Sequence, residues 1–219
     1  MTRSWRFVAL AAFFVTALVV SNIIAVKLVE ISGRVFPAGL VVFPLSYLLA
    51  DVLSEVYGFR AARAVIWLGF GCNLLAVAAI QIAIALPAAP FYERQQAYED
   101  VLGTTWRIFL ASLTAYVVGE LANAYVLQRM KAVTSGRLLW TRTIGSTIVG
   151  EGLDSAIFVT IAFAGTGAGL LNPIVTTWAI KVGYETIATP LTYAIVNYLK
   201  RSEGIDVYDV GVAAVQTRA

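Results

Sequence analysis

Six long apolar segments separated by short polar stretches set the pattern of this chain. Their predicted bounds are residues 7–29, 35–57, 64–86, 106–128, 143–165 and 173–199. At about 1.5 Å per residue, a helix of about 20 residues crosses a hydrocarbon core about 30 Å thick. In lipid the backbone must satisfy its own hydrogen bonds, so the segments are predicted to be helices. The pattern predicts an all-α integral membrane protein, with one six-helix domain over residues 1–201 and a polar cytoplasmic tail over 202–219.

The composition agrees with a membrane protein. Hydrophobic residues make up 59% of the chain and charged residues 13%, whereas a soluble domain carries about 25% charged residues. The formal net charge is +3, but the basic residues lie in short loops, which argues against a nucleic-acid partner. One Cys and no His exclude the usual zinc and haem sites and any His-dependent triad, so we expect no metal and no cofactor.

Basic residues are divided unevenly between the two sides of the predicted bundle. One side carries only Arg34, Arg94 and Arg107. The other side carries Arg3, Arg6, Arg60, Arg63, Arg129, Lys131, Arg137, Arg142, Lys200 and Arg201. Short loops rich in Lys and Arg remain in the cytoplasm, so both termini are predicted to be cytoplasmic.

Ionisable residues interrupt five of the six apolar segments. They are Lys27 in the first, Asp51 and Glu55 in the second, Glu120 in the fourth, Glu151 and Asp154 in the fifth, and Lys181 and Glu185 in the sixth. A charged side chain at the centre of a lipid-facing helix costs about 2.5–3.5 kcal/mol. These side chains are therefore predicted to face an interior cavity, to pair with the two lysines, or to be partly protonated. A local pair between Lys181 and Glu185, four residues apart, stays open.

Aromatic and amide side chains share helical faces with these acids. A cavity that combines a few carboxylates with aromatic rings suits a flat ligand rich in N–H donors, and an organic cation would also fit. The candidate substrate-binding residues are Asn22, Tyr47, Asp51, Glu55, Glu120, Asn123, Glu151, Asp154, Ser155, Trp178, Lys181, Tyr184 and Glu185.

Several long motifs carry a resemblance to a known family. They are Ser21-Asn22-Ile-Ile-Ala-x-Lys27, Phe36-Pro-Ala-Gly39, the run from Phe43 to Gly58, Gly119-Glu120-x-x-Asn123, the run from Ser146 to Phe158, and Lys181 with Tyr184 and Glu185. With these motifs the chain resembles the queuosine precursor transporter family, also called the VUT family, over nearly its whole length. The resemblance implies a six-helix inner-membrane importer of 7-cyano-7-deazaguanine and its aminomethyl relative, which are salvaged for the queuosine modification of tRNA.

Under this hypothesis the candidate residues have different roles. Glu151 or Asp154 is expected to accept the N–H groups of the base edge, and Asp51 and Glu55 to take up a proton if transport is proton-coupled. Neutral hydrogen bonds are expected from Asn22, Asn123 and Ser155, and a stacking face from Tyr184 or Trp178.

Two other functions compete with a self-sufficient secondary transporter. A substrate-capture subunit of a separate ATP-driven vitamin-type importer is also a small six-helix membrane protein. Gly150-Glu-Gly-Leu-Asp154 is one residue away from the Gly-x-Gly-Asp spacing of intramembrane aspartyl proteases, and we predict that the protein is not an enzyme. The sequence leaves open whether the chain acts alone or as a homodimer.

Overall fold

The structure, a computed structural model, describes residues 4–133, 139–167, 169–204, 207–208 and 215–216. Its long helices are α1 (Trp5–Ile24), α2 (Phe43–Tyr57), α3 (Phe59–Ala85), α5 (Thr105–Val133), α6 (Leu139–Phe163) and α7 (Leu171–Glu203). The shorter elements are strands β1 (Leu28–Ile31) and β2 (Arg34–Pro37), the 3-10 helix η1 (Ala38–Val41), helix α4 (Gln95–Leu102), and the paired strands β3 (Val207–Tyr208) and β4 (Val215–Gln216).

Several helices are long and apolar enough to cross a membrane. Within the described residues, length and composition qualify the stretches Trp5–Ile24, Arg60–Ala85, Gln95–Gly119 and Ile144–Phe163. Large apolar side chains point outward from the bundle, among them Leu75, which is 71% exposed, and Ile187, which is 81% exposed. Such surfaces match a lipid environment. The protein is an all-α, multi-pass membrane protein, which confirms the predicted fold class.

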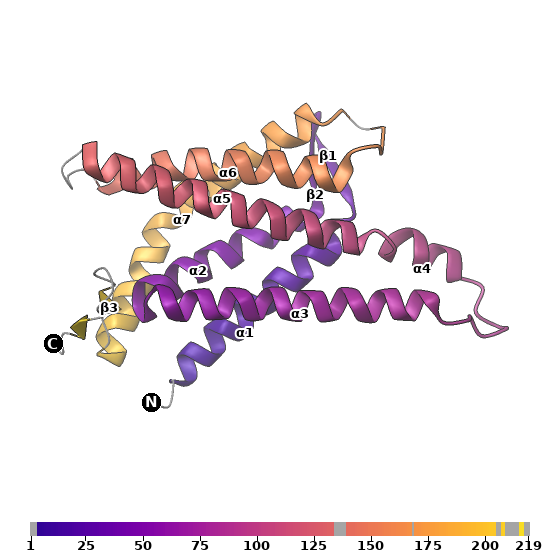
Figure 1. The fold of residues 1–219 in the computed structure, drawn as a ribbon, viewed down its shortest axis with the longest axis horizontal. Coiled ribbons are helices and arrows are strands. Elements are labelled where there is room, and N and C mark those ends of the chain that lie inside the picture. The colour runs from indigo at the N-terminus through magenta and orange to yellow at the C-terminus, as the bar shows by residue number, and fades with distance from the viewer. Residues whose placement is uncertain (1–3, 134–138, 168, 205–206, 209–214, 217–219) are drawn as a thin grey trace.

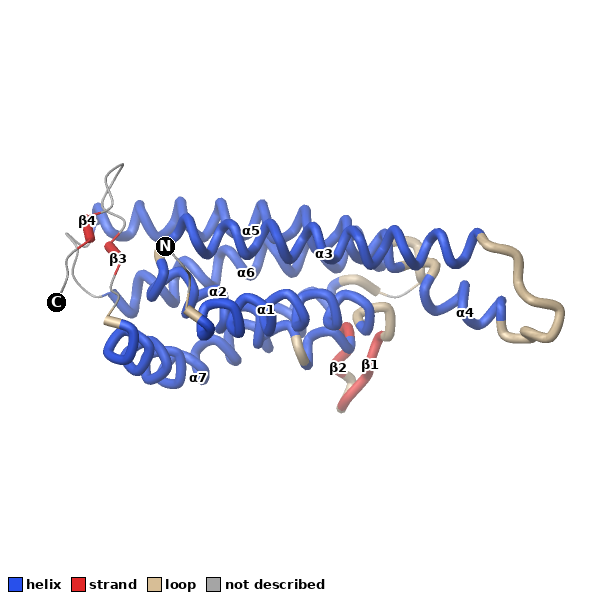
Figure 2. The backbone as a smooth tube through the Cα atoms, turned by 90° about the horizontal axis from the view of Figure 1, so that it is seen from below, coloured by secondary structure: helices blue, strands red, loops and turns tan. Residues whose placement is uncertain are grey.

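The long helices lie in two layers (Figure 2). Helices α3, α5 and α6 form one layer, and α1, α2 and α7 form the other. Between the layers, Phe14 and Leu18 of α1 pack with Leu53 of α2 and Phe70 of α3. Within the first layer, α5 and α6 run side by side (Figure 1) and make the most extensive helix contact described in the structure.

One end of the bundle gathers the first residue before α1, the end of α2 and the end of α7. The Ser4 hydroxyl donates to Glu203 Oε1 at 2.7 Å, and the Tyr57 hydroxyl donates to Glu203 Oε2 at 2.9 Å. The β1–β2 hairpin and α4 lie at the opposite end (Figure 2). There the Asn172 side chain accepts from Val35 N at 3.2 Å and donates to Gly33 O at 2.9 Å, which fastens the hairpin to the start of α7.

The hairpin corrects the predicted bounds of the first two helices. Helix α1 ends at Ile24 and not at residue 29, and α2 begins at Phe43 and not at residue 35. The intervening strands pair in antiparallel register, with Ile31 opposite Arg34. The two residues between them, Ser32 and Gly33, have φ values of 52° and 75°, as a two-residue type I′ turn requires. By hydropathy alone, the apolar residues on both sides of this turn cannot be distinguished from the adjoining helices.

The stretch after the third apolar segment is also more ordered than predicted. No helix is predicted between residues 86 and 106, but residues 95–102 form α4. Its turns are held by side-chain hydrogen bonds four residues apart, from Gln95 to Glu99 at 2.6 Å and from Gln96 to Asp100 at 2.9 Å, which is the spacing of neighbours on a helix surface. Helix α7 likewise continues through Glu203, beyond the predicted start of the tail at residue 202.

Candidate functional site

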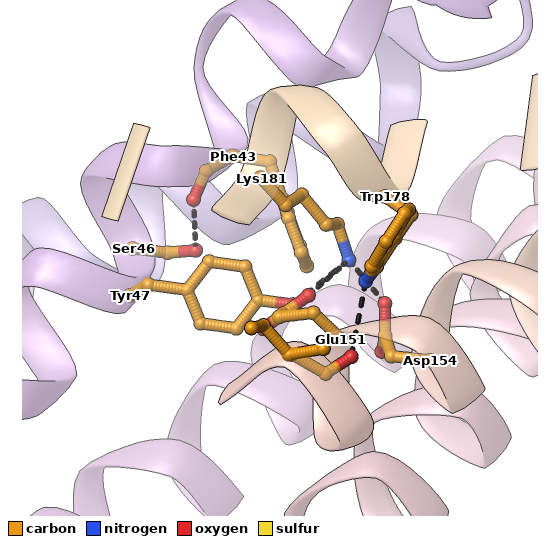
Figure 3. Close-up of polar contacts among 8 residues, drawn as sticks. Phe43, Ser46, Tyr47, Glu151, Asp154, Trp178 and Lys181 are labelled. Carbon is orange, nitrogen blue, oxygen red and sulfur yellow. Dashed lines mark hydrogen bonds and ion pairs between the residues drawn. The ribbon is translucent and has the colours of Figure 1, made fainter. Parts of the chain in front are cut away.

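A buried lysine on α7 forms the centre of a polar cluster between the layers. Lys181 is 6% exposed, and its ammonium forms ion pairs with Asp154 and, at 3.0 Å, with Glu151 Oε2. It also donates to the Tyr47 hydroxyl at 3.0 Å (Figure 3). Glu151 and Asp154 are three residues apart on α6 and share one helical face, while Tyr47 comes from α2. The cluster therefore joins α2, α6 and α7 deep inside the bundle.

Aromatic rings surround the ammonium of Lys181. Its Nζ lies 5.0 Å from the centre of the Phe43 ring and 5.2 Å from that of Tyr47, within the range of a cation–π contact. With one ammonium against two carboxylates, the cluster carries excess negative charge when all three groups are ionised. Such an excess in a low-dielectric interior favours a further cation or proton.

Two glycines let α5 and α6 approach closely beside this cluster. A methyl group at Gly119 would lie 2.9 Å from Asp154 Cβ, and one at Gly150 would lie 2.8 Å from Asn123 Cβ and 3.0 Å from Gly119 O. No side chain fits at either position without moving a helix, and close backbone approach at small residues is a common way to pack membrane helices. The crossing places Asn123 and Asp154 at the same level of the bundle.

A large cavity extends from the Lys181 cluster toward the end of the bundle that contains Glu203. Its volume is about 480 Å³, within the range of small-molecule sites. Four helices contribute to its wall, from Tyr47 and Asp51 on α2 to Lys200 near the end of α7. A smaller cavity of about 70 Å³ adjoins it beside Gly119 and Gly150 and shares much of its lining.

On the hairpin side of Lys181 there is room only for water. A cavity of about 30 Å³ is lined by Asn22, Pro37, Thr177 and the Lys181–Asp154 pair, among others, and a single water needs about 10–15 Å³. Asn22 Nδ2 and Thr177 Oγ1 are buried without a hydrogen-bond partner among the described residues. The Lys181–Asp154 pair therefore separates a ligand-sized cavity on one side from a water-sized one on the other.

Comparison with known proteins identifies the family of this chain. The family model described as "Putative vitamin uptake transporter" matches residues 37–195, which include α2, α3, α5, α6 and most of α7. The protein belongs to this transporter family. It is a membrane transporter and not an enzyme.

Two relatives of this transporter carry a more specific name. A protein of Bacillus subtilis (strain 168), named "Probable queuosine precursor transporter", is 32% identical over 190 residues, which cover 85% of this chain and 83% of the relative. A Haemophilus influenzae protein of the same name is 26% identical over 125 residues, which cover 57% of this chain and 51% of the relative. No solved structure matches this transporter.

The structure brings most of the residues predicted from the sequence to the two sides of the Lys181 cluster. The large cavity is lined by Tyr47, Asp51, Asn123, Glu151, Lys181, Tyr184 and Glu185. Asn22 lines the water-sized cavity, and Asp154 lines both this cavity and the one beside the glycines. Glu185 does not pair with Lys181; its Oε1 accepts from the Thr147 hydroxyl at 2.9 Å.

Trp178 and Ser155 do not line the large cavity, and two further candidates lie outside the described side chains. The Trp178 indole N–H donates to Ile148 O at 3.0 Å, and Trp178 is not among the described residues that line the cavities. Ser155 is fully buried, and its hydroxyl has no hydrogen-bond partner among the described residues. Glu55 on α2 and Glu120 on α5 have side chains outside the described part of the transporter.

The second half of α7 adds cavity residues that sequence reasoning missed. Thr189, Thr192, Tyr193 and Asn197 all line the large cavity. Starting from Glu185, the successive spacings are four, three, one and four residues. The four residues therefore continue the helical face that begins at Lys181. The signal was therefore present as a polar stripe on the sixth apolar segment, but none of these four residues is charged at neutral pH.

Proposed function

We propose that this transporter imports queuosine precursor bases, 7-cyano-7-deazaguanine and 7-aminomethyl-7-deazaguanine, across the cell inner membrane. The observation that carries the proposal is the large cavity, whose volume and mixture of carboxylates and tyrosines suit a flat base rich in N–H donors. The names of the Bacillus and Haemophilus relatives support the same substrate class.

Six membrane crossings with both termini in the cytoplasm are part of the proposal. The basic residues at the start of α3, Arg60 and Arg63, and at the end of α7, Lys200 and Arg201, support this orientation. Ser4, which precedes α1, and Glu203, the last residue of α7, meet at one end of the bundle. The large cavity would then face the cytoplasm.

Glu151 is the acceptor that we propose for the base edge. Its ion pair with Lys181 is made through Oε2, and its side chain keeps 13% exposure. A carboxylate oxygen has two lone pairs, so Glu151 can accept adjacent N–H groups from a base while it stays close to Lys181. Tyr184, which lines the cavity and is 41% exposed, is the ring on which the base would stack.

Uptake of radiolabelled 7-cyano-7-deazaguanine into proteoliposomes that contain only this chain tests the proposal. We expect saturable uptake that a proton gradient directed inward stimulates, because Asp51 and other cavity acids can bind protons. Uptake indifferent to the gradient would indicate a facilitator and remove the proton coupling. Binding without uptake would contradict a self-sufficient carrier and favour a capture subunit of an ATP-driven importer.

Replacing Glu151 with glutamine is expected to lower the initial uptake rate by more than about tenfold, which corresponds to about 1.4 kcal/mol. The amide keeps the shape of the side chain but exchanges one acceptor for a donor, which repels a base N–H. Glu93→Gln, in the exposed turn before α4, serves as the matched control and should transport normally. Normal uptake by Glu151→Gln and by the corresponding amide variants of Asp51, Glu120 and Asp154 would overturn the assigned roles.

A further inference from the structure

The lining of the large cavity combines several carboxylates with tyrosine rings. We propose that the cavity selects a positively charged base, one with a protonated amine, over a neutral base that carries a nitrile. This inference rests on the proposed function and specifies which member of the substrate class is preferred. Glu185 and Asp51 are the residues to which we assign the discrimination.

The charges near the Lys181 cluster are predominantly negative. Asp51, Glu151 and Glu185 line the large cavity, and Asp154 lies directly behind them. Lys181 is the one cation in this part of the described lining, and it already pairs with Glu151 and Asp154. Lys200 also lines the cavity, but it follows Glu185 by 15 residues, or about 22 Å of helix. At that distance, near the water-facing end, its charge is largely screened from the acids.

Four of the donors that line the cavity, those of Lys181, Thr147, Thr189 and Thr192, are already engaged. Lys181 has three N–H groups, and it contacts Asp154, Glu151 and Tyr47. The Thr147 hydroxyl donates to Glu185, and those of Thr189 and Thr192 donate to backbone carbonyls one turn earlier, at 2.7 Å and 3.2 Å. A nitrile nitrogen can only accept hydrogen bonds, so it would depend on the hydroxyls of Tyr184 and Tyr193 and on the amides of Asn123 and Asn197, which also line the cavity.

The acceptors, in contrast, are available to a ligand. Asn123 Oδ1 is buried without a hydrogen-bond partner among the described residues, although Asn123 lines the cavity. Glu185 receives one bond from Thr147 at Oε1, and a carboxylate has further lone pairs for an ammonium. Hydrogen bonds between an ammonium and a carboxylate are about twice as strong as neutral ones. An ammonium would thus satisfy acceptors that a nitrile leaves unsatisfied.

Tyrosine rings add to the preference for a cation. Tyr47, Tyr184 and Tyr193 line the same cavity, and the Tyr47 ring already lies near one ammonium, that of Lys181. A cation over a tyrosine ring is stabilised by the negative face of the ring, whereas a nitrile, whose nitrogen end is electron-rich, is not. The charge, the hydrogen-bonding groups and the rings of this cavity therefore favour the same ligand.

The test is competition between the two bases for the full-length chain in proteoliposomes at pH 7. We expect the initial uptake rate of the aminomethyl base to exceed that of the cyano base by at least about tenfold. In Glu185→Gln the ratio of the two rates should fall several-fold toward unity, because one carboxylate acceptor is lost. Asp51→Asn should act in the same direction and provides a second variant if Glu185→Gln does not fold. Glu93→Gln should leave the ratio unchanged.

The possible failures can be told apart. Uptake of both bases without preference, or with preference for the cyano base, would overturn the inferred selectivity and leave the proposed function standing. A ratio that neither Glu185→Gln nor Asp51→Asn changes would overturn the assignment to these two residues. Absence of uptake and of binding for both bases would overturn the proposed function and this inference with it.

Discussion

Replacing Lys181 with methionine is expected to abolish uptake and to lower the stability of the protein in detergent by about 3–5 kcal/mol. The side chain is buried and forms ion pairs with Asp154 and Glu151. Methionine has a similar length but no charge, so both carboxylates would lose the one cation with which they pair among the described residues. Breaking a buried pair from one side is costly because the remaining charge stays desolvated. Thermal melting followed by size-exclusion chromatography measures the stability, and proteoliposome uptake measures the function.

A double variant separates the structural effect from the functional one. The double variant Lys181→Met with Asp154→Asn removes one buried carboxylate together with the ammonium. Much of the decrease in melting temperature caused by Lys181→Met should therefore be reversed. Uptake should not return, because Lys181 also contacts Glu151 and Tyr47. Lys27→Met, at an exposed lysine before β1, is the matched control. If Lys181→Met alone melts like the unmodified protein, the ion pairs do not stabilise the bundle.

The second large effect is expected from alanine at the crossing of α5 and α6. In an open helical position, Gly→Ala stabilises a helix by about 0.5–1 kcal/mol. At Gly150 the sign should reverse, since the added methyl group would lie 2.8 Å from Asn123 Cβ and 3.0 Å from Gly119 O. Overpacking of this kind costs about 1–3 kcal/mol. We expect Gly150→Ala to lower the melting temperature and, by displacing Asn123 from the cavity wall, to reduce uptake.

The control for this substitution lies on the neighbouring helix. A methyl group at Gly183 of α7 would meet no atom within 4 Å, so Gly183→Ala should be neutral or stabilising. Gly119→Ala, whose methyl group would lie 2.9 Å from Asp154 Cβ, should behave like Gly150→Ala. Equal melting temperatures for Gly150→Ala and Gly183→Ala would show that α5 and α6 can separate at little cost.

The sequence predicted the parts of this fold that depend on long apolar segments. Six such segments correspond to the six long helices, because apolar length is a one-dimensional property of the chain. The β1–β2 hairpin was missed for a local reason. Ser32-Gly33 is a recognisable turn, but the apolar residues around it were assigned to the adjoining helices. Likewise, α4 has only eight residues, half of them polar, so hydropathy does not detect it.

The sequence singled out the residues of the Lys181 cluster but not the way in which they pair. Lys181, Glu151 and Asp154 stood out as ionisable residues in apolar segments. The sequence left open a local pair of Lys181 with Glu185, whereas the structure pairs Lys181 with two acids of α6 and Glu185 with Thr147. The rotation of each helix about its axis decides between these pairs, and that rotation depends on tertiary packing. The same limit of sequence reasoning applies to Trp178, which is on the same helix as Lys181 but donates a hydrogen bond to the backbone of α6.

The distribution of the Lys181 cluster over α6 and α7 bears on how the protein is made. Synthesis proceeds from the N-terminus, so α6 leaves the ribosome with Glu151 and Asp154 before Lys181 of α7 exists. Alone in lipid, each of these acids would oppose insertion by about 2.5–3.5 kcal/mol. Only seven residues, 164–170, separate α6 from α7 along the chain, so both helices can remain together at the insertion machinery. We therefore expect α6 and α7 to enter the bilayer together as one helical hairpin. Lys181 would then already offset part of the negative charge of Glu151 and Asp154.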